Sequence, residues 1–140
     1  MKTKPRPGDL RHPAFTRNSD YHHIFAAKAA AEAARVLRFF ESERPDDSRP
    51  RQAITAIEAW SHGIGKLGMV SVRKLALAAH AAARSAKSDP AKFAARAAGH
   101  AIATWHVPTH SLATFSYAAK ADYSARCARS IRTSASRKSA

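Results

Sequence analysis

Apolar residues recur at intervals of three or four positions along most of this chain, and the alternation that marks β-strands is absent. Glycine and proline fall between the apolar stretches and, apart from Gly99, not inside them. Alanine, the residue with the highest helix propensity, supplies 33 of the 140 positions. The pattern therefore predicts an all-α fold, a single compact bundle of about five helices with short connections and basic flexible tails.

The breaks in the pattern set the expected helix boundaries. Asn18, Ser19 or Asp20 is expected to cap the first helix and Ser71 the third, while Gly63 suits the end of the second. Alanine-rich faces should let neighbouring helix axes approach toward the short end of the usual ~8–10 Å range. The expected helices cover residues 20–43, residues 50–62, residues 71–87, residues 89 to about 108, and residues from about 109 onward.

Charge divides the chain further. The formal net charge is +14, and much of it lies at the two ends. We expect a basic N-terminal arm at residues 1–17, a helical domain at residues 18–128 and a disordered basic Ser/Arg-rich tail at residues 129–140. Such ends attract polyanions through the summed field without specificity, and a solubilising or non-specifically adhesive role is favoured over a dedicated nucleic-acid arm.

No stretch of the sequence approaches the roughly 18 consecutive apolar residues of a membrane span, so no membrane association is expected. The N-terminus is basic but has no apolar segment behind it, which does not fit a secretory signal. Cys127 is the one cysteine, so no internal disulfide can form. A reducing cytoplasm is the expected compartment.

Histidines carry the most specific chemical signal. His100, His106 and His110 lie close together around Pro108, and His80 on the preceding predicted helix could join them. Four histidines could hold zinc, but the proline disturbs regular helical geometry between His106 and His110. Structural histidines bonded to hydroxyl or carbonyl groups at helix seams are the favoured interpretation. No metal or other cofactor is therefore expected.

Catalytic constellations are weak. Asp46 and Asp47 fit a loop and cap pair, and Glu58 is expected to pair with a nearby arginine. Cys127 has no predictable base beside it, and the segment GIGKLG lacks the spacing of a phosphate-binding loop. The sequence therefore favours a protein that is not an enzyme.

Three blocks occur in a characteristic order: FFESERPDDSRPRQAITAIEAW, then ALAAHAAAR, then AARAAGHAIATWHVPTHSLATFSYAAKA. In this order the chain resembles a helical family of bacterial immunity proteins, the Imm-five-like family, from about Ala30 to Ala121. It departs from the usual family pattern at Trp105, which replaces a small residue, and at Ala113, which replaces glycine. The matching positions are Arg49, Pro50, Arg51, Ala53, Ile54, Glu58, Trp60, His80, Arg84, Gly99, His100, His106, His110, Tyr117 and Lys120.

The resemblance implies a non-enzymatic binding protein that neutralises a cognate bacterial toxin. Given the charge of +14, the toxin is expected to present an acidic or neutral surface. Two alternatives stay open: a small basic nucleic-acid-associated protein, and a metal-binding protein that uses the four histidines above. The family-motif positions and expected partner contacts are Arg49, Arg51, Glu58, Trp60, His80, Arg84, His100, Trp105, His106, His110, Tyr117 and Lys120.

Overall fold

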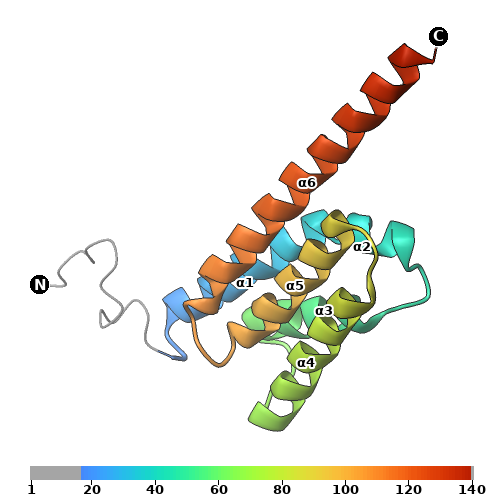
Figure 1. Ribbon diagram of the computed structural model, residues 1–140. Coiled ribbons are helices and arrows are strands. Elements are labelled where there is room, and N and C mark those ends of the chain that lie inside the picture. The colour runs from blue at the N-terminus through green and yellow to red at the C-terminus, as the bar shows by residue number, and fades with distance from the viewer. Residues whose placement is uncertain (1–16, 140) are drawn as a thin grey trace, which may run out of the picture.

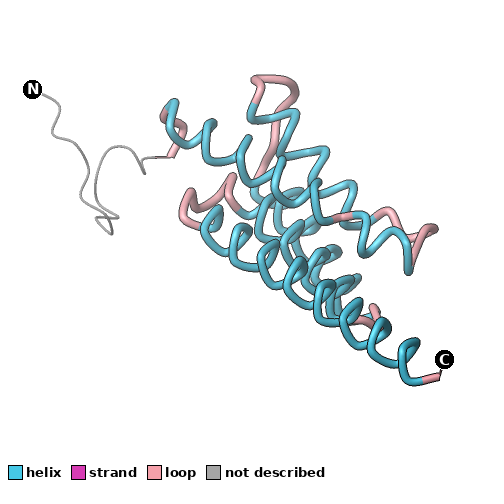
Figure 2. Tube along the Cα trace, turned by 90° about the horizontal axis from the view of Figure 1, so that it is seen from above, coloured by secondary structure: helices cyan, strands magenta, loops and turns pink. Residues whose placement is uncertain are grey.

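The computed structural model describes residues 17–139, and their apolar positions gather around one central helix. That helix, α5, contacts each of the other five. Figure 1 shows α5 lying among its neighbours, and Figure 2 shows the same bundle from above. Within the described residues no strand occurs, so the all-α prediction is confirmed. The helices are α1 (Asp20–Val36), α2 (Arg38–Glu43), α3 (Arg49–Ser61), α4 (Met69–Ser85), α5 (Asp89–Ala103) and α6 (His110–Lys138).

Alanine makes the central position of α5 possible. Its alanines Ala91, Ala94, Ala97, Ala98 and Ala101 have no exposed surface. Because a methyl group is the whole side chain, the neighbouring helices can approach closely on every side. Larger apolar side chains of α2, α3 and α5 that are also fully or almost fully buried complete the core, namely Phe40, Ile54, Ile57 and Ile102.

The first expected helix is interrupted at Leu37, so residues 17–139 form six helices and not five. At Leu37 the backbone stays in the right-handed helical region, with φ −61° and ψ −25°. Its N–H, however, donates to the carbonyl of Ala34, three residues back, instead of the residue four back. Leu37 itself is completely buried, so the tightened turn keeps an apolar side chain in the core while α2 begins.

Local capping signals explain two other helix boundaries. The Oγ of Ser19 accepts the N–H of His22 at the start of α1, with a 3.2 Å separation. After α3, Gly63 adopts φ +75°, a left-handed conformation that other residues adopt only with strain.

The expected start of the helix at Ser71 is wrong. α4 begins at Met69, and Gly68 occupies the cap position. Ser71 lies inside the first turn, where its Oγ accepts the N–H of Gly68. Ser71 therefore accepts the hydrogen bond from a position inside the helix, and not from the cap position that precedes the helix.

The C-terminal segment also differs from expectation. α6 continues to Lys138, so residues 129–138 are helical and not a disordered tail. Alanine and arginine favour helix, and no glycine or proline interrupts this stretch. We call residues 126–138 the outer half of α6; it projects beyond the other helices, and residues 129–139 are all exposed (Figure 1).

The expected N-terminal arm lies outside the described residues, except for Arg17. The guanidinium carbon of Arg17 is 4.5 Å from the centroid of the Trp105 ring, a cation–π arrangement. Among the described residues, no helix has both the length and the apolar character needed to cross a membrane.

Candidate functional site

Three of the four candidate histidines meet where α4, α5 and α6 pack together. His80 comes from α4, His100 from α5, and His110 is the first residue of α6. The ring centroids are 5.1 Å apart for His80 and His100 and 5.7 Å apart for His100 and His110. Tyr117, two turns along α6, stacks on His100 with a centroid distance of 5.1 Å and an interplanar angle of 10°. These four residues form what we call the histidine cluster.

A glycine creates the space for this cluster. Gly99 lies inside α5, where glycine is roughly 1 kcal/mol less favourable than alanine. A Cβ atom at this position would lie only 2.6 Å from Cε1 and 2.7 Å from Nε2 of His80. The missing side chain is therefore what allows the His80 ring to lie against the α5 backbone.

Burial favours the neutral form of the three histidines in the cluster. It lowers the pKa of His100 to about 4, and the nearby His80 and His110 add smaller contributions. The pKa values of His80 and His110 are also lowered, mainly by burial. Within the described residues, Nδ1 of His80 and Nδ1 of His100 are buried without a hydrogen-bond partner. The cluster therefore combines ring packing with polar atoms that the surrounding protein does not satisfy.

The ring stack continues toward the surface. The Nζ of Lys120 lies 4.8 Å from the ring centroid of Tyr117 and 5.9 Å from that of Phe93. Phe93 and Tyr117 are themselves 6.2 Å apart, so α5 and α6 share one aromatic seam. Lys120 is exposed and brings a positive charge to the solvent end of this seam.

His106 does not join the cluster. It is exposed and lies in the turn between α5 and α6, whereas His110 begins the next helix. Pro108 between them ends the helical continuity that a pair on one helix face would require. Among residues 17–139, no group of three histidine, cysteine, aspartate or glutamate side chains has the arrangement to hold a metal ion.

Comparison with known proteins adds the family. Residues 17–137 match the family described as Imm-5 like putative immunity protein. The chain belongs to this family. A search of curated proteins found no match, and a search of solved structures found none either.

A second aromatic group lies between α1 and α3, within the residues that match the family. The sequence analysis included Trp60 of this group among the candidates but not His22 or His23. Trp60 is 9% exposed and stacks on His23 with a centroid distance of 4.0 Å. His22, whose ring lies 4.9 Å from that of Trp60, is fully buried. Its Nδ1 accepts the backbone N–H of Asn18, which places the proton on Nε2 for donation to the carbonyl of Thr104.

His22 was missed although the sequence holds a signal for it. It lies four residues before Ala26 and seven before Ala29, on the buried stripe of α1. Burial lowers its pKa, which keeps the ring neutral and able to both accept and donate. His22 thus ties the start of α1 to the end of α5, and its role is structural.

Of the charged candidates, Lys120 contacts the histidine cluster through Tyr117, and Arg84 follows His80 by one turn on α4. Arg49 pairs with Asp47 at 2.6 Å, and Arg51 pairs with Glu41 at 2.9 Å. Glu58 is exposed, and the two arginines of the same helix pair with Asp47 and Glu41 instead. Arg84 is exposed in the last turn of α4. The twelve candidate positions therefore do not converge on one site.

Proposed function

We propose that this protein binds and neutralises a cognate bacterial toxin. Membership of the Imm-5 like family over residues 17–137 is the observation that carries the proposal. An immunity protein acts by binding, so it needs a rigid surface with complementary chemistry and no reaction of its own. The half-buried histidine cluster fits such a role because its ring contacts join α4, α5 and α6.

The chemistry of the toxin follows from the charge. A chain with a net charge of +14 attracts an acidic surface and repels a basic one at long range. Trp60 and Trp105 are each only 9% exposed, so neither can supply a large contact area. Of the candidate positions, the exposed Arg51, Arg84 and Lys120 are better placed to meet a carboxylate-rich partner. The proposed place of action is the bacterial cytoplasm, which the single cysteine supports.

Co-expression tests the proposal directly. The toxin encoded beside the gene would be induced in a bacterial host with and without this chain at matched levels. We expect survival only when the chain is present, together with a complex that co-elutes in size-exclusion chromatography. Death at the same rate in both strains, with both proteins folded and no complex formed, would contradict the proposal.

The outer half of α6 favours a second candidate, binding to nucleic acid. This segment carries Arg126, Arg129, Arg132, Arg137 and Lys138 and no acidic residue. Binding to phosphates should weaken steeply as salt rises from about 50 to 200 mM, because each neutralised phosphate releases counterions. Titration of duplex DNA at two salt concentrations measures this slope, and salt-independent or absent binding removes the candidate.

A further inference from the structure

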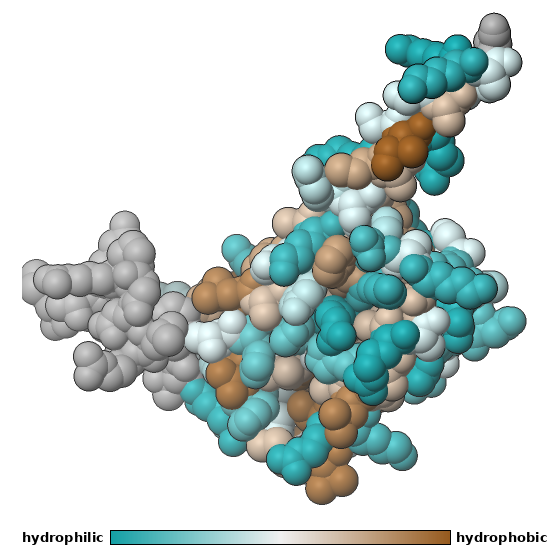
Figure 3. Space-filling view, in the orientation of Figure 1, coloured by the Kyte–Doolittle hydropathy of each residue, from teal (hydrophilic) through white to brown (hydrophobic). Residues whose placement is uncertain are grey.

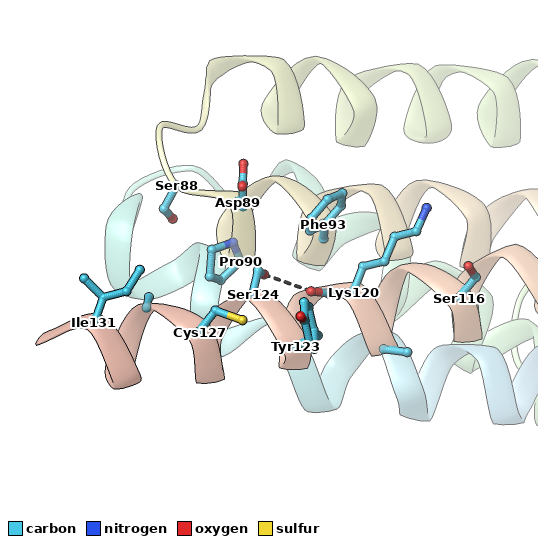
Figure 4. A pocket seen from close by; sticks show the side chains of 12 residues that line it. Ser88, Asp89, Pro90, Phe93, Ser116, Lys120, Tyr123, Ser124, Cys127 and Ile131 are labelled. Atoms are coloured by element: carbon cyan, nitrogen blue, oxygen red, sulfur yellow. Dashed lines mark hydrogen bonds between the residues drawn. The ribbon is translucent and has the colours of Figure 1, made fainter. Parts of the chain in front are cut away.

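A groove runs between the first half of α5 and residues 116–131 of α6, so that it extends from the bundle onto the outer half. It has a volume of about 880 Å³. Pro90 and Phe93 line it from α5, while Tyr123, Cys127 and Ile131 line it from α6 at intervals of four residues (Figure 4). Most of its lining is therefore apolar or aromatic.

The apolar side chains on the α6 side of the groove are open to solvent. Tyr123 is 65% exposed and Ile131 is 70% exposed. On the projecting end of the helix, apolar atoms lie directly beside hydrophilic ones (Figure 3). A helix that presents an apolar stripe with charged flanks is suited to pack against another helix of the same kind.

The charge around the groove has one dominant sign. Lys120 lines its inner end, and Arg129 and Arg132 line an adjoining hollow on the other side of Ala128. Glu43 of α2 also lines that hollow, but its carboxylate already accepts the backbone N–H groups of Lys87 and Ser88. No aspartate or glutamate follows Asp122 in the sequence, and Asp122 already pairs with Arg35 of α1 at 2.7 Å. Asp89, in the first turn of α5, is the single acidic side chain that lines the groove.

The positive charge around the groove limits the kinds of partner that could bind there. A second copy of this chain would place the five cations of its own outer half next to the cations of this groove. At contact distance, salt does not screen the resulting electrostatic repulsion. A nucleic acid would satisfy the cations but would leave the apolar walls of Phe93, Tyr123 and Ile131 without apolar partners. A helix with one apolar face and acidic flanks satisfies both features.

Stability of the outer half points the same way. An isolated helix shorter than about 12–15 residues is marginal in water, and the like charges at Arg126, Arg129 and Arg132, three residues apart on one face, weaken it further. Residues 129–139 are all exposed, so little burial compensates. An acidic helix lying along this segment would therefore order it while it covers the groove.

We propose that the groove between α5 and residues 116–131 of α6 is the docking site for an acidic amphipathic helix of the toxin. This assignment rests on the proposed function, because the toxin is the partner that the family implies. The apolar stripe of that helix lies over Phe93, Tyr123 and Ile131, and its carboxylates face Lys120, Arg129 and Arg132.

Cys127 supplies the readout, since it lines the groove and is the one thiol of the chain. The probes are two synthetic helical peptides of roughly 20 residues, long enough to form helix, with the same leucine stripe and either glutamate or lysine on the flanks. We expect the glutamate peptide to slow the reaction of Cys127 with a thiol reagent at least tenfold. The lysine peptide should leave the rate unchanged, and equal protection by both peptides would overturn the assignment.

Matched variants locate the contact. Ile131→Ser should weaken binding of the glutamate peptide at least tenfold. Ile64→Ser removes a side chain of similar exposure, 65%, in the loop before α4 and should leave binding unchanged. Unaltered binding by Ile131→Ser would overturn the assignment. So would a concentration-dependent dimer that protects Cys127, or a DNA duplex that binds more tightly than the glutamate peptide.

A cell-protection assay tests the groove as the toxin site separately from the immunity role. If the original chain protects against the toxin, Ile131→Ser should lose that protection and Ile64→Ser should keep it. Equal protection by the original chain and Ile131→Ser would leave the immunity role standing and overturn the groove as the toxin site. Failure of the original chain to protect would reject the proposed function, while the peptide measurements would still report on the groove.

Discussion

The bundle and the outer half of α6 are both helical, but different forces hold them. In the bundle, Ala118 and Ala121 of α6 are fully buried against its neighbours. Ten residues further along the same helix, Ile131 is 70% exposed. Burial of apolar side chains stabilises the helix in the bundle, whereas the outer half depends mainly on the intrinsic helix propensity of its residues. One helix can therefore combine a rigid structural half with a half that is free to contact a partner.

The largest expected difference between the regions comes from truncating one bulky apolar side chain in each. Phe40→Ala removes a fully buried ring and should lower the free energy of unfolding by about 3–5 kcal/mol. Ile131→Ala should change it by less than about 0.5 kcal/mol, because the side chain is exposed. Urea denaturation measures both values, and similar losses for the two variants would contradict the contrast.

The next effect concerns the contact between Gly99 and His80. Gly99→Ala places a methyl group 2.6 Å from the His80 ring and should destabilise the fold by about 1–3 kcal/mol through overpacking. In a His80→Ala background the same change should be neutral or stabilising by up to about 1 kcal/mol, because alanine favours helix. The double-mutant cycle isolates the coupling. Additive effects would show that the ring does not lie on the glycine.

Local chemistry made part of this fold predictable. Ser19 and Gly63 mark helix ends by rules that involve only adjacent residues, and both positions were anticipated. Leu37 gives no such signal, because the tightened turn there depends on burial of its side chain in the assembled bundle. The prediction of a disordered tail was wrong because it relied on low apolar content, which does not prevent residues 129–138 from forming a helix.

The site shows the same division between local and tertiary information. The sequence placed His80, His100 and His110 among the candidates, and the packing of three helices decided that they meet. A glycine within a helical pattern was the one local clue to this contact. His22 was overlooked because its partner, the carbonyl of Thr104, lies 82 residues away in the chain.

The histidine cluster should make the bundle sensitive to acid. The folded-state pKa of His100 is about 4, below the ordinary value of 6.5, so the unfolded chain binds more protons between these values. The stability contribution is complete above pH 6.5 and is lost as the pH falls toward 4. Urea denaturation across this range should show a smaller pH dependence for His100→Phe than for the original chain. The same change at the exposed His106 should leave the dependence unaltered, and equal slopes for all three proteins would exclude this role of His100.

The smallest expected effect on stability comes from removing residues 129–140. All described residues in this segment are exposed, so their removal should change the free energy of unfolding by less than about 0.5 kcal/mol. The truncated chain also loses Ile131 and two of the flanking cations, and it should bind the glutamate peptide at least tenfold more weakly. Urea denaturation and Cys127 protection, measured on the same preparation, check the two expectations together. A loss above about 1 kcal/mol would mean that the outer half packs against the bundle, and its exposed groove would then be better understood as part of the fold than as a surface for a partner.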